Sequence, residues 1–148
     1  MIKSKKLTRL KSVKHAFFNR LGGRSDGIFE SLNCGLGSTD NKKNISKNLT
    51  IVKNKIQIKS KKIILLKQIH SNEFHFIDKN SKSIKKEFKG DALITNKINL
   101  PIAVLTADCA PILVHDEKEK MIAAIHAGWK GAYKDIIPRV VNFMIKKG

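Results

Sequence analysis

The chain has 148 residues, of which 41% are hydrophobic, so it can form a core and lies outside the composition range of disordered proteins. No segment reaches the ~18 consecutive apolar residues of a membrane span, and the basic N-terminus lacks the continuous apolar segment of a signal peptide, so we expect a cytoplasmic protein with no membrane partner. The net charge of +18 favours nucleic-acid binding in principle, but 26 of the 30 basic residues are Lys spread along the chain and only four are Arg, so no specific nucleic-acid partner is expected.

The first part of the chain predicts one strand, one glycine-rich loop and one helix. Residues 15–18 form a short apolar run typical of a strand. Residues 19–27 contain paired glycines, which allow a loop to bend around an anion, although from the residues alone a plain surface turn is the favoured explanation. Within residues 41–58 the apolar positions recur at spacings of four, three and four, which predicts an amphipathic helix. These positions are Ile45, Leu49, Val52 and Ile56.

The second part of the chain consists of six short apolar runs followed by a second helical pattern. Turn-forming residues bound the runs, which predicts strands of a well-covered sheet. The runs are residues 63–66, 74–77, 92–94, 102–105, 112–114 and 121–125. Helical spacing returns at residues 133–145, where Pro138 is expected in the first turn of a helix. The pattern predicts a mixed α/β fold in a single domain.

Three side chains that can bind metal lie at the ends of these runs. His70 follows the first run, Cys109 lies between the fourth and fifth, and His126 follows the sixth. One thiolate and two imidazoles with a free fourth position make a catalytic zinc site, which lowers the pKa of bound water to about 7. The gaps of 39 and 17 residues contain no short ligand pair, and a packed Cys or a hydrogen-bonded His explains each residue separately. Spacing alone therefore leaves both interpretations open.

The remaining His and Cys residues are expected to have structural roles. They are His15, His75, His115 and Cys34. A disulfide between Cys34 and Cys109 is not expected, because nothing in the sequence indicates export to an oxidising compartment.

Six segments of the chain resemble the successive motifs of one protein family. They are residues 15–23, 31–33, 68–70, 91–95, 106–111 and 126–131. The most specific are Ala-Asp-Cys-x-Pro at residues 107–111 and His-Ala-Gly-Trp at residues 126–129. In this order they resemble the YfiH-like family, also called multicopper polyphenol oxidase or laccase-domain proteins and purine nucleoside phosphorylases.

The resemblance implies an α/β fold with mixed β-sheets layered between helices. Members of the family continue beyond the point at which this chain ends, so the C-terminal part of the fold is expected to be missing and residues 1–148 to form a single incomplete domain. The resemblance also implies Zn²⁺ bound by His70, Cys109 and His126, with copper as the alternative metal.

The activities that the resemblance implies are those of a purine nucleoside phosphorylase with adenosine deaminase activity. The implied substrates are adenosine, inosine, guanosine and methylthioadenosine, so the partners are small-molecule purine nucleosides and phosphate. Arg20 with the glycines after it is the candidate for holding phosphate, and Asp108 for orienting a ligand or moving a proton. Three positions depart from the family pattern: Ser71 replaces Gly, Leu49 replaces Arg, and Lys130 replaces Arg and lacks its bidentate fork.

Other functions stay open at this point. One is a copper polyphenol oxidase, because two His and one Cys with a weak axial Met also describe a blue-copper site, and Met121 lies five residues before His126. Another is a hydrolase that edits peptidoglycan precursors, a role described for related bacterial proteins. A non-catalytic basic binding module is the third. The oligomeric state and the preferred nucleoside are not predicted.

Overall fold

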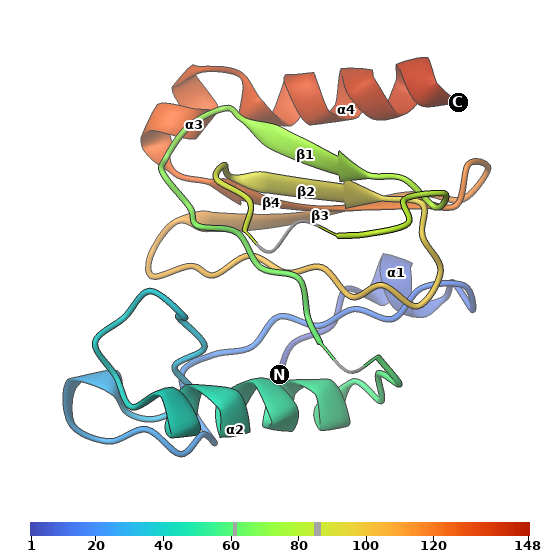
Figure 1. The fold of residues 1–148 in the computed structure, drawn as a ribbon. Coiled ribbons are helices and arrows are strands. Elements are labelled where there is room, and N and C mark those ends of the chain that lie inside the picture. The colour runs from blue at the N-terminus through green and yellow to red at the C-terminus, as the bar shows by residue number, and fades with distance from the viewer. Residues whose placement is uncertain (61, 85–86) are drawn as a thin grey trace. The chain divides into compact units, whose positions relative to one another are not determined.

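The computed structural model describes residues 1–60, 62–84 and 87–148 and divides into two compact units (Figure 1). Unit 1 comprises Met1–Lys59 and unit 2 comprises Ser60–Gly148. The mixed α/β class expected from the sequence is confirmed. The single domain over residues 1–148 stays a prediction.

Unit 1 is built around one long helix. Its elements are α1 (Lys5–Thr8), the short 3-10 helix η1 (Gly27–Phe29) and α2 (Lys42–Lys55). The side chain of Asn41 caps α2 by accepting a hydrogen bond from the main-chain N–H of Lys43. Gln57 follows the helix with a left-handed φ of 53°. The helix expected within residues 41–58 is therefore confirmed, whereas the strand expected at residues 15–18 contributes only one bridge, between Phe17 and Ile2.

A fully buried asparagine on α2 holds the glycine-rich loop of unit 1. The side-chain oxygen of Asn48 accepts from the main-chain N–H of Arg24 at 2.7 Å. Its amide group donates to the hydroxyl of Ser25 at 2.9 Å and to the carbonyls of Ser31 at 3.2 Å and Asn33 at 2.8 Å. Buried polar groups persist where their hydrogen bonds are satisfied, so this side chain acts as a fixed point for residues 24–33.

Unit 2 contains one four-stranded mixed sheet. The strands are β1 (Phe74–Ile77), β2 (Ala92–Thr95), β3 (Ala110–Asp116) and β4 (Met121–Ala127). Their order is β1-β2-β4-β3, with β1 and β2 parallel and the other two pairs antiparallel (Figure 1). Four of the six predicted strands are thus confirmed.

The other two predicted strands are wrong. Residues 63–66 and 102–105 share a single parallel bridge, between Ile64 and Ile102. These segments form an apolar cover for one sheet face, where Leu66 is buried with Leu93. An apolar run indicates burial and not strand pairing. A segment that covers a sheet face is also apolar, although it forms no hydrogen-bonded ladder with the strands.

The opposite face of the sheet is covered by a helix. The chain leaves β4 into the short helix α3 (Trp129–Tyr133) and then into α4 (Ile136–Lys147), which lies along the sheet in Figure 1. Pro138 is the third residue of α4, in the first turn, where a missing N–H costs nothing. The buried residues of this layer are Ala92, Ile94, Met121, Ala123, Ile125, Ala127, Ile136, Val140 and Met144. Among the described residues, no helix has the length and apolar character to cross a membrane.

Candidate metal centre

Three side chains with metal-binding atoms meet at one end of the unit 2 sheet. One nitrogen from each of His70 and His126 and the sulfur of Cys109 all lie within 4.8 Å of one another. The separation between His70 Nε2 and Cys109 Sγ is 4.0 Å. The two imidazole rings are 4.9 Å apart at an angle of 82°. Tetrahedral zinc bonds of about 2.0–2.1 Å to nitrogen and 2.3 Å to sulfur require donor separations of roughly 3.3–3.6 Å, so this set fits zinc after closing by about 1 Å.

The sheet explains why residues so distant in sequence converge. His126 is the penultimate residue of β4, and Cys109 directly precedes β3, whose first residue pairs with Ala127. His70 lies in the turn that leads into β1, and not at the end of a strand as the sequence analysis expected. Side chains alternate between the faces of a strand. Because Ile125 and Ala127 face α4, His126 points to the opposite face.

A buried carboxylate, Asp91, connects both histidines. Its side chain accepts from the main-chain N–H groups of His70 at 3.0 Å and Ser71 at 2.6 Å, and from the Ser71 hydroxyl at 2.8 Å. Asp91 Oδ1 also lies 2.8 Å from His126 Nδ1. The main chain adds two bonds, because Asp91 donates to the Glu73 carbonyl and accepts from the His126 N–H. The sequence analysis assigned no role to Asp91, although residues 91–95 form one of the segments that resemble the family motifs.

The environment of Asp91 keeps its carboxyl ionised. Burial by itself raises the pKa of Asp91, but the hydrogen bonds from Ser71, His126 and His70 outweigh burial and lower the pKa below its usual value. A carboxylate accepts hydrogen bonds and donates none. Nδ1 of His126 is therefore the donor in this hydrogen bond, and Nε2 is the ring nitrogen that remains to bind a metal, as in the carboxylate–histidine pairs of zinc sites.

The two turns that carry His70 and Cys109 are braced against each other. The side-chain amide of Gln68 donates to the carbonyl of Leu105 at 2.7 Å and accepts from its N–H at 2.8 Å. His70 and Asp108 have left-handed φ values of 56° and 80°. Such conformations persist where the surroundings hold them and concentrate at functional sites.

The glycine two residues after His126 leaves room for the three donor side chains. A β-carbon on Gly128 would lie 3.0 Å from His70 Cδ2, 3.2 Å from Cys109 Sγ and 3.6 Å from His126 Cε1. The close approach of all three side chains to one main-chain position gives the His-Ala-Gly-Trp motif a physical reason: the glycine forms the floor of the donor cluster.

The two other predicted site residues lie outside the donor cluster. Asp108 is exposed and directly precedes Cys109. Arg20 belongs to unit 1, where its side-chain Nε donates to the Glu30 carbonyl at 2.8 Å. Its own carbonyl accepts from the N–H groups of Ser31 and Leu32. The structure therefore brings together His70, Cys109 and His126, with Asp108 beside them in sequence.

Two of the residues expected to have structural roles, His15 and Cys34, are buried. His15 Nε2 accepts from the Ser4 N–H at 2.8 Å, and burial together with the charge of Lys3 lowers the pKa of His15. Burial raises the pKa of the Cys34 thiol to about 11, so it stays protonated at neutral pH. Cys34 and Cys109 both have free thiols.

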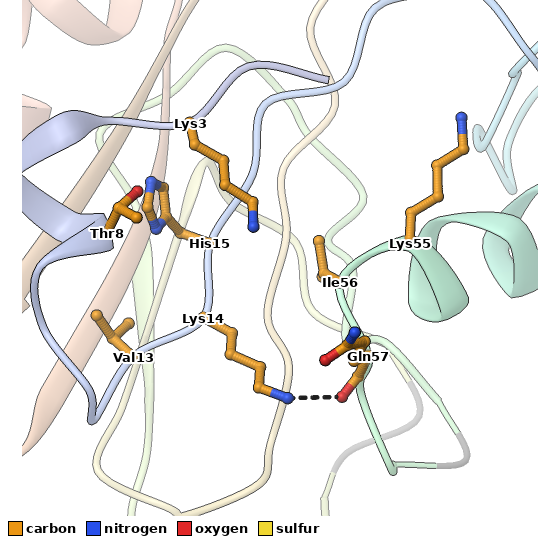
Figure 2. Close-up of a pocket in the computed structure, with 8 residues that line it drawn as sticks. All are labelled: Lys3, Thr8, Val13, Lys14, His15, Lys55, Ile56 and Gln57. Carbon is orange, nitrogen blue, oxygen red and sulfur yellow. Dashed lines mark hydrogen bonds between the residues drawn. The ribbon is translucent and has the colours of Figure 1, made fainter.

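A cavity of about 190 Å³ lies within unit 1 (Figure 2). Its lining contains no carboxylate and none of the predicted site residues. Lys14 Nζ, on the cavity wall, donates to the carbonyl of Gln57 at 3.0 Å. The lining residues are Lys3, Thr8, Val13, Lys14, His15, Lys55, Ile56 and Gln57.

Residues 14–148 match the family described as multi-copper polyphenol oxidoreductase laccase. The chain belongs to this family. Its relatives in the laccase family include a purine nucleoside phosphorylase of Corynebacterium glutamicum, 33% identical over 140 residues, which are 95% of this chain and 57% of the relative. A purine nucleoside phosphorylase of Bacteroides thetaiotaomicron is 30% identical over 143 residues, 93% of this chain and 53% of the relative.

Solved structures of similar proteins confirm the YfiH-like fold. The Neisseria meningitidis protein NMB0706, of family DUF152, aligns with a TM-score of 0.71 at 30% identity over 84% of this chain and 49% of its own. The Bacillus licheniformis protein YfiH aligns with a TM-score of 0.77 at 27% identity over 86% of this chain and 50% of its own. The chain thus spans about half the length of the relatives that it matches.

Proposed function

We propose that this chain binds zinc through His70, Cys109 and His126 and supplies the metal-binding part of a purine nucleoside phosphorylase. The convergence of one sulfur and two imidazole nitrogens within 4.8 Å carries the proposal. The buried Asp91 at His126 Nδ1 supports it, because a second hydrogen-bonding partner of this kind is typical of histidines that bind metal. The purine nucleoside phosphorylase names of the relatives supply the reaction class.

The proposed substrates are adenosine, inosine, guanosine and methylthioadenosine together with phosphate, and adenosine deamination is a second activity. Zinc, when bound, acts as a Lewis acid and lowers the pKa of coordinated water to about 7. His126 is 3% exposed and forms the buried side of the donor cluster, whereas His70 is exposed and Cys109 is half-buried. The cluster is therefore accessible from the His70 side, where a substrate can approach.

Two residues outside the donor cluster have proposed substrate roles. Asp108 is exposed and directly precedes Cys109, and its carboxylate is proposed to orient a nucleoside hydroxyl or to accept a proton. Arg20 is the proposed phosphate ligand. The KM for phosphate should rise in Arg20→Ala and stay unchanged in Arg139→Ala, a control on the exposed face of α4. An unchanged phosphate KM and turnover in Arg20→Ala would remove Arg20 from the proposal.

The structure favours zinc over the blue-copper alternative that the family description raises. A blue-copper site uses a weak axial ligand, usually Met. Met121 is five positions before His126 on β4, so the two side chains lie on opposite sheet faces, and Met121 is buried in the core beneath α4. Met144 lies in the same core. A copper oxidase would require an axial ligand from elsewhere, and an intense visible thiolate-to-copper band in protein purified without added metal would favour it.

Metal analysis of two cysteine variants tests the proposal. Cys109→Ser should lose zinc, because a hydroxyl is a much weaker ligand than a thiolate, and Cys34→Ser should keep it, because Cys34 is not one of the three grouped donors. Phosphate-dependent release of adenine from adenosine should follow the zinc content. Equal zinc in Cys109→Ser and the parent would refute the metal site. Full zinc without phosphate-dependent adenine release would refute the proposed reaction for this chain alone.

A further inference from the structure

We infer that Asp91 is a positioning residue that sets the geometry of both histidines at once, so that the metal site depends on one buried carboxylate. The inference rests on the proposed metal site. Asp91 is 0% exposed and cannot contact substrate in this position, so it acts through the residues that it holds.

The first half of the argument concerns the His126 ring. Asp91 Oδ1 lies 2.8 Å from His126 Nδ1, and Asp91 stands opposite His126 at the junction of β2 and β4, where the His126 N–H donates to the Asp91 carbonyl at 2.7 Å. The ring is therefore fixed by its main chain and by its side-chain nitrogen. With the proton held on Nδ1, the lone pair of Nε2 is available for a metal.

The second half concerns the turn that carries His70. The main-chain N–H groups of His70 and Ser71 and the hydroxyl of Ser71 all donate to the same carboxylate. The hydroxyl of Ser71 also accepts from the Glu73 N–H at 3.1 Å, which closes the turn. These bonds keep His70 at its φ of 56°, a conformation that costs free energy in a residue with a side chain. Without them the turn is free to relax and to carry the imidazole away from Cys109.

Only a carboxylate can satisfy all these donors. It presents two oxygens and about four lone-pair sites, and every group around it is a donor. Asp91→Asn keeps the shape but replaces one oxygen by an NH₂ group, which must then face a donor. The side chain of Asn can satisfy either His126 or the Ser71 turn but not both, so a substitution of one atom should displace one of the two histidine ligands.

The test combines zinc affinity with the tautomer of His126. In the metal-free parent chain, long-range ¹H–¹⁵N NMR spectra should show His126 protonated on Nδ1, and in Asp91→Asn they should show a mixture of tautomers or protonation on Nε2. In competition with a chromogenic chelator, Asp91→Asn should bind Zn²⁺ about 10- to 100-fold more weakly than the parent. The matched control is Asp40→Asn, which removes a buried carboxylate of unit 1 that is likewise held by hydrogen bonds from Ser25 and Asn33. It should leave both measurements unchanged.

Each outcome bears on the inference. Parent-like zinc affinity in a folded Asp91→Asn variant would overturn it, as would His126 protonated on Nε2 in the metal-free parent, a measurement that needs no variant. If Asp40→Asn lost as much zinc affinity as Asp91→Asn, general destabilisation would explain both losses and the inference would also be overturned. If the parent binds no Zn²⁺, the proposed function fails, while the tautomer still decides whether Asp91 orients His126.

Discussion

Gly131, in α3, lies directly against the main-chain carbonyl of Ser71: a β-carbon on Gly131 would come within 2.7 Å of that oxygen. Contacts of this length require the main chain to move. The helix α3, which begins at the Trp of the His-Ala-Gly-Trp motif, therefore packs directly against the turn that carries His70.

Replacing Gly131 by Ala should destabilise the protein and weaken zinc binding. Ala is favoured over Gly in a helix by about 1 kcal/mol, but overpacking against a rigid backbone costs typically about 1–3 kcal/mol, and relief of the clash displaces the His70 turn. Urea denaturation and zinc competition would measure the two effects. Gly37→Ala is the control, because a β-carbon there meets nothing within 4 Å. A Gly131→Ala variant as stable as the parent, with the same zinc affinity, would show that the turn yields without cost.

Gly128→Ala should separate metal binding from folding. The φ of Gly128 is −71°, which Ala adopts without strain, and the added methyl would contact side chains of His70 and Cys109 and not backbone. The free energy of unfolding without metal should change little, whereas the donors could no longer close around an ion. A loss of roughly tenfold in zinc affinity corresponds to about 1.4 kcal/mol. Loss of stability without loss of affinity would contradict this prediction.

Acid should weaken unit 1 through Asp40. The hydrogen bond from the Ser25 hydroxyl is the largest cause that lowers the pKa of Asp40 below its ordinary value of 3.8, against the opposing effect of burial, with help from Asn33, Asn41 and Lys42. A carboxyl whose pKa is lowered by folding stabilises the native state above the unfolded pKa, and that contribution is lost as the pH falls through the folded pKa.

Ser25→Ala should therefore raise the pKa of Asp40 and flatten the fall in stability below about pH 4. Carboxyl NMR titration and urea unfolding at several pH values would show both effects. Ser46→Ala, on the exposed face of α2, serves as the control. If the pKa of Asp40 were the same in parent and Ser25→Ala, the assigned cause would be incorrect.

Trp129 should report nucleoside binding. It is the single Trp of the chain, it is 75% exposed, and it directly follows Gly128 at the floor of the donor cluster. A purine bound at the cluster should change the solvent exposure of the indole or stack against it. We expect a saturable change in Trp fluorescence on addition of adenosine to the zinc-loaded chain, and none in Cys109→Ser. A signal of equal size in both proteins would place the nucleoside elsewhere.

The spacing of apolar residues predicted the helix and strands that bury one face. It failed for segments that cover the sheet without pairing in it and for a polar residue buried by its hydrogen bonds. The apolar spacing in α2 located that helix, and turn residues delimited β1, β2, β3 and β4. The runs at residues 63–66 and 102–105 are only partly buried, apart from Leu66, and lie over a sheet face without joining the ladder. Asn48 could not be found from pattern, because its burial depends on donors and acceptors more than 10 residues away in sequence.

The candidate site was only partly visible in the sequence for a related reason. Spacing left His70, Cys109 and His126 open to a structural explanation, and the motifs that resemble the YfiH-like family singled them out. Asp91 escaped notice because its partners are mainly main-chain N–H groups, which have no sequence signature. Such groups become recognisable only when the strand register is known.

The alternation of β4 has an evolutionary consequence. Its odd-numbered residues pack beneath α4, while His126 projects from the other side. Because a shift of one position exchanges the two sides of a strand, a single-residue insertion or deletion within β4 would expel the apolar side chains and withdraw the imidazole in the same event. We therefore expect insertions and deletions among related chains to avoid β4, so that the length of this strand is inherited unchanged.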